Sequence, residues 1–332
     1  MINEINEETL GLLDDRIGDG GEGEVFRIPN MPGQVYKKFK KSVSADISEV
    51  GLIETIKILE TFSSEDKKYI ESRTVWPHTL VRCDSRVSGF IMPILGPEFF
   101  CLQGQAASPI ETFSDWNKLS YRDITAANLN IYTSLPNLSE PSHRLELLKL
   151  LLDLTKIFSV LHKYGVVIGD VSGRNLVWTI EPEPRVVVID CDGLRKAGTD
   201  AVTKAKQSPD WFDKHLVGPT TLDSDLYKLA LAVFRAYFSA TISYPDRPLT
   251  LGSMTDEDKA LLELAIRGTG QSARPSAMEW QLLLQRFLDA AATREMFGDR
   301  VVIDWHDGEV PVRRPITNPS VSDERPDISW KK

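Results

Sequence analysis

The sequence has 332 residues, of which 42% are hydrophobic and 26% are charged, as in a folded globular protein with enough chain for two lobes. The formal net charge of −9 argues against a general nucleic-acid binder, because affinity for a phosphate backbone needs an excess of Lys and Arg. It does not exclude the binding of a single nucleotide, which needs only local positive charge and a metal ion.

The three cysteines, Cys83, Cys101 and Cys191, have no metal-ligand spacing and cannot all pair, which predicts a reducing environment. The first ten residues, MINEINEETL, are acidic and lack the apolar core of a signal peptide. No apolar run approaches the length of a membrane span. We therefore expect a cytoplasmic protein that binds neither nucleic acid nor a membrane.

A glycine-rich stretch, GDGGEGEV at residues 18–25, fits the pattern G-x-G-x-x-G-x-V. Its glycines, Gly18, Gly20 and Gly23, would let backbone amides approach phosphate oxygens without obstruction by side chains. The stretch lacks the Lys-Ser/Thr ending of a Walker A loop, and it continues as a strand rather than as the helix of a Rossmann fingerprint. Alone the pattern is weak, because glycine-rich turns are common.

The next strand, residues 34–39, alternates so that Val35 and Lys37 share one face. Lys37 lies one hairpin away from the glycine turn, which favours a phosphate-binding lysine over a solvated edge residue. Two further strands within residues 74–95 would complete a small antiparallel sheet. The following segment, 97–141, shows little periodicity and is interpreted as an irregular insertion.

Helices are predicted where apolar residues recur at helical spacing, over residues 46–61, 143–162 and 223–239. A fourth helix begins at a capping box of Ser276 and Glu279 and runs to about residue 291. The last segment, 309–332, is polar and rich in proline, which indicates an extended tail.

The stretch 165–193 contains two short β-branched runs, one ending near Asp170 and the other near Asp190, with Arg174 and Asn175 between them. Such runs are typical of short buried strands. Carboxylates and an amide at strand ends suit a hard cation and phosphate groups. The alternative is a pair of strands that Asp and Asn merely cap as turn-forming residues.

In this order the motifs resemble those of a eukaryotic-like protein kinase over about residues 13–295. Some pieces are more similar to a divergent bacterial branch, whose catalytic loop reads I-G-D and whose metal motif reads I-D-x-D. Members of that branch often accompany PP2C-type phosphatases and von Willebrand A-domain proteins, which makes these two expected partners. The pieces are Trp76-Pro77, Gly89–Pro93, Ile168–Asp170 and Ile189–Asp192.

The resemblance implies an α+β, bilobal fold, with a small antiparallel sheet in the N-lobe and a mainly helical C-lobe. The N-lobe would cover residues 1–95, the C-lobe 96–308, and the extended tail 309–332. The expected cofactors are ATP and Mg²⁺.

The resemblance also implies a role for each matched residue. Gly18, Gly20 and Gly23 would cover the phosphates, and Lys37 would bind them while pairing with a glutamate of the helix over 46–61. Glu54 is our choice for that glutamate and Glu49 the reserve. Val25 and Val35 would lie above the adenine and Val177 below it, and the connection between the lobes would hold its edge through Met92, Pro93 and Leu95.

For the chemistry, the resemblance implies that Asp190 and Asn175 hold Mg²⁺ and that Asp170 accepts the proton of the attacking hydroxyl. Arg174 would neutralise the transferring phosphoryl group, with a surface arginine as an almost equal alternative. Two roles would be structural. Asp225 would tie the catalytic loop to its helix, and Asp210 would pair with Arg274.

Two motifs depart from the family pattern. Ile168-Gly169-Asp170 has no arginine before the base, which argues against activation by phosphorylation, although Thr199 and Thr203 follow in the segment. Asp190-Cys191-Asp192 stands in place of D-F-G. This leaves Asp192 as a further metal ligand or as a turn cap.

The function implied is an ATP- and Mg²⁺-dependent protein kinase acting on an unknown protein substrate, at Ser or Thr hydroxyls with Tyr left open. One alternative is a pseudokinase that binds nucleotide and serves as a scaffold. The other is a small-molecule phosphotransferase of the aminoglycoside-kinase type, against which the full glycine pattern argues.

Overall fold

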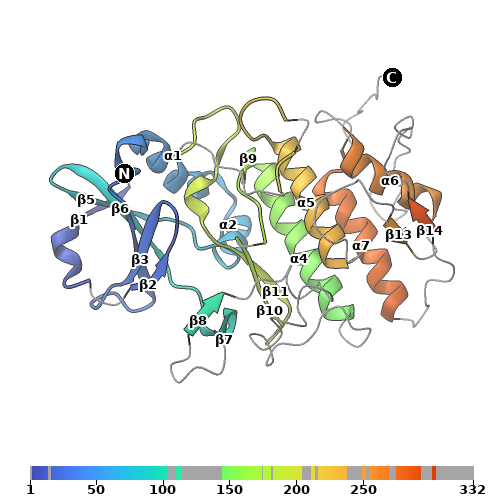
Figure 1. The fold of residues 1–332 in the computed structure, drawn as a ribbon, viewed down its shortest axis with the longest axis horizontal. Coiled ribbons are helices and arrows are strands. Elements are labelled where there is room, and N and C mark those ends of the chain that lie inside the picture. Colours follow the sequence, from blue (N-terminus) through green and yellow to red (C-terminus); the bar gives the residue numbers. More distant parts are fainter. Residues whose placement is uncertain are drawn as a thin grey trace. The chain divides into compact units, whose positions relative to one another are not determined.

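A computed structural model describes residues 2–13, 16–103, 110–113, 144–173, 175–180, 182–203, 211–213, 216–237, 249–251, 255–268, 274–292 and 301–303. Within these residues the protein is of mixed α+β class, with one six-stranded sheet and six α-helices (Figure 1). No helix of this part of the chain combines the length and apolar character needed to cross a bilayer. The chain divides into two compact units. The first comprises Met1–Pro97, Val160–Asp170 and Val187–Lys206, and the second comprises Glu98–Ser159, Val171–Val186 and Gln207–Lys332.

The first unit is organised around the six-stranded sheet, whose strand order is β1-β5-β6-β4-β3-β2. All neighbouring strands are antiparallel except β1, which runs parallel to β5. The strands are β1 (Asn3–Asn6), β2 (Arg16–Asp19), β3 (Gly23–Arg27), β4 (Gln34–Phe39), β5 (Thr79–Cys83) and β6 (Arg86–Pro93). The predicted strands over 34–39 and 74–95 are confirmed, whereas β1 was not foreseen.

Two α-helices and a short strand pair complete the described part of this unit. The helix expected over 46–61 is α1 (Glu49–Ile58) followed by the 3-10 turn Leu59–Thr61, and Ser48 caps it by accepting a hydrogen bond from the Gly51 amide. The other elements are α2 (Ser64–Glu71), β9 (Val166–Val167) and β12 (Arg195–Lys196), and the two strands pair antiparallel.

The two faces of the sheet carry different side chains. On one face Leu10, Ile28, Tyr36, Val81 and Ile91 form a buried cluster. The 3-10 turn Glu7–Leu10 contributes to it, and the hydroxyl of Tyr36 lies 3.0 Å from a carboxylate oxygen of Glu7. The N-terminal segment therefore covers this face and leaves the opposite face for Lys37.

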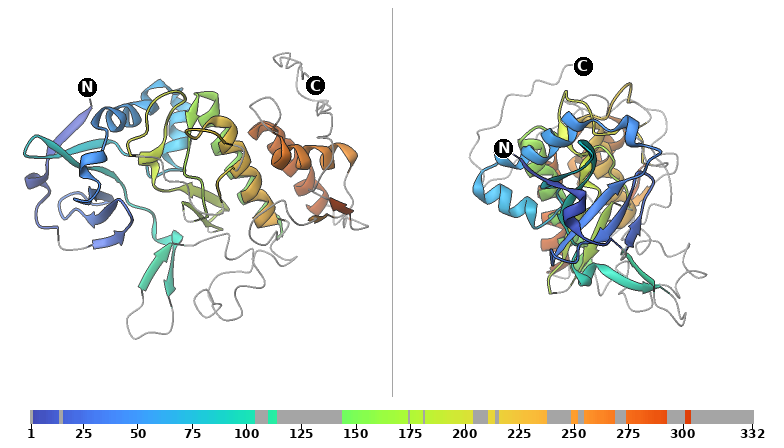
Figure 2. Two further views of the ribbon diagram at one scale, coloured as in Figure 1. Left: turned by 45° about the horizontal axis from the view of Figure 1, so that its top comes forward. Right: turned by 90° about the vertical axis from the view of Figure 1, so that its left-hand side faces the viewer.

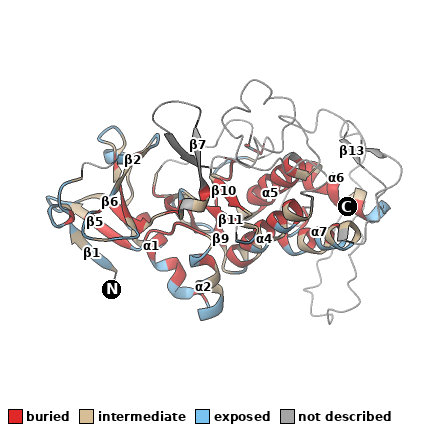
Figure 3. Ribbon diagram, turned by 90° about the horizontal axis from the view of Figure 1, so that it is seen from below, coloured by how far each residue is buried: buried red, intermediate tan, exposed pale blue. Residues whose placement is uncertain are grey.

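The described part of the second unit contains the α-helices α5, α6 and α7 and most of α4, whose last residues belong to the first unit. Within it, α5 is buried along most of its length (Figure 3), which explains why its sequence is apolar nearly all round. The capping box is confirmed, because the amides of Ser276 and Glu279 bond to each other's side chains at 3.0 and 3.3 Å. The helices are α4 (Arg144–Lys163), α5 (Leu222–Tyr237), α6 (Asp256–Arg267) and α7 (Ala277–Ala292).

Among the residues that the structure describes, three further strand pairs are present. One of them lies inside the segment 97–141, so the expectation of an irregular insertion is wrong for the described strands there (Figure 2). The pairs are β7 (Phe100–Gln103) with β8 (Ile110–Phe113), β10 (Leu176–Thr179) with β11 (Arg185–Val188), and β13 (Leu249–Leu251) with β14 (Val301–Ile303). The predicted tail, 309–332, lies outside the described residues.

Candidate functional site

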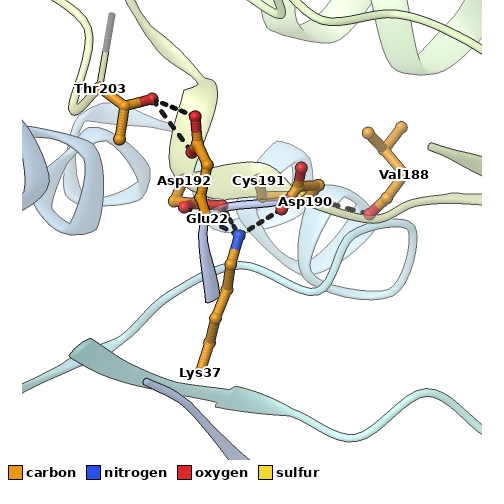
Figure 4. A network of polar contacts seen from close by, with 7 residues as sticks. All are labelled: Glu22, Lys37, Val188, Asp190, Cys191, Asp192 and Thr203. Atoms are coloured by element: carbon orange, nitrogen blue, oxygen red, sulfur yellow. Dashed lines mark hydrogen bonds and ion pairs between the residues drawn. The ribbon is translucent and has the colours of Figure 1, made fainter. Parts of the chain in front are cut away.

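The centre of the candidate site is the side chain of Lys37, which projects from β4 in the first unit and is only 8% exposed. Its ammonium group contacts a carboxylate oxygen of Asp190, and it lies 2.8 and 3.0 Å from the two carboxylate oxygens of Asp192 (Figure 4). Burial alone would lower the pKa of Lys37, but the charges of Asp192 and Asp190 outweigh it and raise the pKa. Lys37 is therefore held as a cation.

The residues beside Lys37 are set by strand register. Val25 lies opposite Lys37 on β3, and Phe90 lies opposite it on β6. Val35 precedes Lys37 by two positions and pairs with Met92, so both share the face of Lys37. The structure thus brings together on one face the side chains predicted to contact adenine from above and the predicted phosphate-binding lysine. Pro93 ends β6, and Leu95 is buried just beyond it.

Asp190 and Asp192 reach Lys37 through a tight turn after β11. Asp190 has a left-handed backbone conformation, with φ 62° and ψ 45°, and it precedes the 3-10 turn Cys191–Gly193. Aspartate tolerates this conformation far better than a β-branched residue would. The turn is anchored at the start, because the thiol of Cys191 donates to the Val188 carbonyl at 3.2 Å.

The two aspartates differ in environment. Asp192 is 4% exposed, and burial raises its pKa to about 6, although the charge of Lys37 acts in the opposite direction. Asp190 is 48% exposed on its side chain. Desolvation opposes its ionisation, but the charge and hydrogen bond of Lys37 prevail and hold the pKa of Asp190 below its ordinary value. Asp190 is therefore the more exposed member of the pair and the one open to another ligand.

The carboxylates of Asp190 and Asp192 could supply some of the ligands of a hard cation, but not a complete coordination shell. Two carboxylates meet one ammonium, which leaves negative charge that a divalent ion can balance, and oxygen ligands are those that Mg²⁺ prefers. Within the described residues no group of three His, Cys, Asp or Glu side chains could hold a metal ion. Mg²⁺ commonly binds through one or two carboxylates and completes its shell with water and phosphate oxygens, so this set suits a metal that arrives with a nucleotide.

The glycine turn between β2 and β3 lies against the stem of Lys37. The Gly20 amide donates to the Gly23 carbonyl at 2.9 Å, which closes the turn. A β-carbon at Gly23 would lie 2.9 Å from the Lys38 carbonyl oxygen and 3.2 Å from Cγ of Lys37. Glycine is therefore required at Gly23 by the close approach of β4. A β-carbon at Gly21 would meet nothing within 4 Å.

Sequence reasoning missed a contact at the tip of this turn. The hydroxyl of Thr203 lies 3.1 Å from both carboxylate oxygens of Glu22 (Figure 4). The neighbouring Val202 carbonyl accepts a hydrogen bond from the Ser48 amide at 2.7 Å, at the start of α1. The segment after Asp192 is thus fastened to both the glycine turn and α1. An acidic residue within a glycine loop was the only signal for it in the sequence.

The predicted partner of Lys37 on the helix is replaced. Glu54 is exposed, and the carboxylates that contact Lys37 are those of Asp190 and Asp192. The reserve candidate, Glu49, contacts Arg82 instead, at 2.5 Å. The reason is the phase of α1, because Thr55 occupies the inward position next to Glu54 and its hydroxyl donates to the Leu194 carbonyl at 2.8 Å.

The other predicted residues fall in different parts of the chain. Asp170 belongs to the first unit and follows β9, and its amide donates to the Ile168 carbonyl at 3.1 Å. Asn175 and Val177 belong to the second unit, with Val177 buried in β10. Arg174 lies outside the described residues.

A buried ion-pair cluster lies in the second unit. The guanidinium of Arg274 contacts Asp213 at 2.6 Å and Asp223 at 2.9 Å, and it is fully buried. Asp210, the partner that we expected for Arg274, lies outside the described residues, and Asp225 is buried near the start of α5. This cluster has the character of a structural centre, because the charge of a fully buried Arg is balanced there by two carboxylates of the same unit.

The chain matches no protein-family model and no curated protein.

Proposed function

We propose that the protein is an ATP- and Mg²⁺-dependent protein kinase that transfers the γ-phosphoryl group to Ser or Thr hydroxyls. The observation that carries the proposal is the environment of Lys37. It is a buried ammonium on the same sheet face as Val25, Val35 and Met92, in contact with the glycine turn and with Asp190. A buried cation beside a glycine turn and an ionised aspartate suits a metal-bound polyphosphate.

In this proposal the ammonium of Lys37 binds the α- and β-phosphates, and the glycine turn with Gly18, Gly20 and Gly23 covers the phosphates. Asp190, the more exposed of the two carboxylates, would hold the metal ion. When bound, Mg²⁺ neutralises charge on the phosphates. Lys37 keeps the nucleotide in place, and Asp170 accepts the proton of the attacking hydroxyl.

Several parts of the proposal rest on the sequence alone. These are the roles of Asn175 as a second metal ligand, Arg174 as a neutralising residue and Val177 below the adenine. The protein substrate, and an association with a PP2C-type phosphatase and a von Willebrand A-domain protein, rest on the resemblance to the bacterial kinase branch.

A second candidate is a pseudokinase that binds nucleotide without transferring phosphate. The observation that favours it is the outward position of Glu54, because both carboxylates at Lys37 come from the turn after β11. Both candidates require nucleotide binding. They differ only in turnover.

The experiment that separates them is transfer of labelled phosphate from γ-labelled ATP with Mg²⁺, to the protein itself and to generic protein substrates. The wild type is compared with Asp170→Ala and Asp190→Ala, and with Asp200→Ala as an exposed aspartate of the same unit. We expect labelling of Ser or Thr by the wild type and by Asp200→Ala, and a loss of about 10²–10⁴ in rate in the other two variants. Nucleotide binding with no labelling by any of the four proteins would favour the pseudokinase.

A further inference from the structure

The proposed function assigns no role to Asp192, the buried carboxylate at Lys37. Asp192 directs both of its oxygens to the ammonium of Lys37, at 2.8 and 3.0 Å. Asp190 offers one oxygen. The side chain of Asp192 is 4% exposed, whereas that of Asp190 is 48% exposed. Asp192 is therefore the fixed partner of Lys37, and Asp190 is the one that can change ligand.

The turn that carries Asp192 is held at both ends. At the start of the turn, the Cys191 thiol donates to the Val188 carbonyl. The same carbonyl, at the end of β11, accepts a hydrogen bond from the Val75 amide at 3.1 Å, which ties β11 to the segment before β5. At the end the Leu194 carbonyl accepts from the hydroxyl of Thr55 on α1. The position of Asp192 is therefore fixed by the fold, not by Lys37 alone.

From this geometry we infer that Asp192 is the positioning residue of Lys37, and that it takes the place of a carboxylate from helix α1. The inference rests on the proposed function, in that Lys37 is taken to bind phosphate. Asp192 holds the ammonium against the glycine turn, which would leave Asp190 free to hold the metal ion. Glu54 has no part in it, because it is exposed and Thr55 occupies the inward position of α1.

Three variants test the inference through nucleotide kinetics. Asp192→Asn keeps the shape of the side chain and removes its charge, Glu54→Gln does the same on α1, and Lys37→Met removes the cation. We expect Asp192→Asn to lower kcat/KM for MgATP by about 10- to 100-fold, the usual effect of removing a residue that orients a ligand-binding group. Most of the loss should be in KM. Glu54→Gln should change kcat/KM by less than about twofold.

A double variant shows whether Asp192 acts through Lys37. In the Lys37→Met background, Asp192→Asn should cause no further loss of affinity for MgATP, measured by titration calorimetry. A full additional loss in that background would overturn the inference, and so would a greater loss from Glu54→Gln than from Asp192→Asn. A purely structural residue would lower the melting temperature without this dependence on Lys37.

A measurement without nucleotide keeps the inference separate from the proposed function. The rate of acylation of Lys37 by an amine-reactive ester is mapped by mass spectrometry, with the half-exposed Lys38 as internal reference. Asp192→Asn should increase labelling of Lys37 by about threefold or more, the equivalent of one lost hydrogen bond. Glu54→Gln and Asp190→Asn should leave Lys37 protected. Unchanged labelling in Asp192→Asn would refute the positioning role even if the protein bound no nucleotide.

If Asp192→Asn does not fold, acylation of Lys37 in the Asp190→Asn variant tests the inference instead. Protection of Lys37 equal to that of the wild type supports Asp192 as the fixed partner. Labelling of Lys37 as fast as that of Lys38 overturns it.

Discussion

Asp192 lies 155 positions after Lys37 in the sequence, and yet both oxygens of its carboxylate are within hydrogen-bonding distance of the lysine ammonium. The pair joins β4, one of the two central strands of the sheet, to the turn after β11. Both side chains are almost completely buried. A buried pair of this kind contributes little net stability over an apolar pair, but the loss of one partner leaves the other charge without compensation.

The first prediction concerns stability. Lys37→Met leaves the buried carboxylate of Asp192 without its cation, so we expect the free energy of unfolding to fall by about 3 kcal/mol in urea titrations at pH 7. Lys38→Met is the matched control. Lys38 is half exposed, and loss of its ion pair with Glu7 should cost less than about 1 kcal/mol. Equal losses in the two variants would contradict the buried ion pair.

The second prediction concerns the glycine turn. Gly23→Ala places a β-carbon against the Lys38 carbonyl and the stem of Lys37, so the turn and the lysine must separate. We expect at least about a tenfold loss of MgATP affinity, because displacement of the lysine from the turn removes a charge-assisted contact. Gly21→Ala meets no atom within 4 Å and should bind as the wild type does. Fluorescence titration with a nucleotide analogue measures both, and equal binding by the two variants would speak against close packing at Gly23.

The third prediction is a pH dependence at the N-terminal segment. Burial opposes ionisation of Glu7, but hydrogen bonds from Lys38, Ser88 and Tyr36 hold its pKa below the ordinary value. Stability from this group is therefore fully present above the unfolded-state pKa and is lost as pH falls through the lower, folded-state pKa. Glu7→Gln should cost about 1 kcal/mol at pH 7, and the difference from the wild type should shrink at pH below about 4.

Urea titrations over that pH range test this behaviour. The exposed neighbour Glu8 provides the control, and Glu8→Gln should leave the free energy of unfolding at pH 7 close to that of the wild type. A difference between Glu7→Gln and the wild type that is constant from pH 7 to pH 3 would be inconsistent with the proposed hydrogen bonds.

The fourth prediction concerns cysteine reactivity. Burial raises the pKa of the Cys191 thiol, which is also engaged with the Val188 carbonyl, whereas Cys83 is exposed. Since the thiolate is the reactive form, iodoacetamide at pH 8 should alkylate Cys83 in the native protein and Cys191 only after unfolding. Peptide mapping reports each site. Alkylation of Cys191 at the rate of Cys83 would show that the turn after β11 opens readily.

The face of the sheet that carries Lys37 could be predicted from sequence, because strand alternation depends on short-range spacing. Val35 and Lys37 share a face in any regular strand, and the observed register adds Val25 and Met92 to it. The helices α4 and α7 were also predictable, one from its apolar periodicity and the other from its capping box.

The partner of Lys37 could not be predicted in the same way. It depends on the left-handed conformation of Asp190, which directs the following turn toward β4, and no local pattern specifies it. Which face of α1 points inward could not be predicted either. Apolar residues lie on several sides of that segment, so they do not show whether Glu54 or Thr55 faces the interior. Strand β1 has four residues and mostly exposed side chains, and its partner β5 is far along the chain, so it gave no periodic signal.

The most direct test of the account is the binding of ATP to the wild type and to Lys37→Met, measured by titration calorimetry with Mg²⁺ and with EDTA in its place. The proposed site predicts saturable binding by the wild type that weakens without Mg²⁺, and at least about a tenfold lower affinity in Lys37→Met, as for the loss of one charge-assisted contact. No binding by the wild type, or equal affinity in the two proteins, would contradict it.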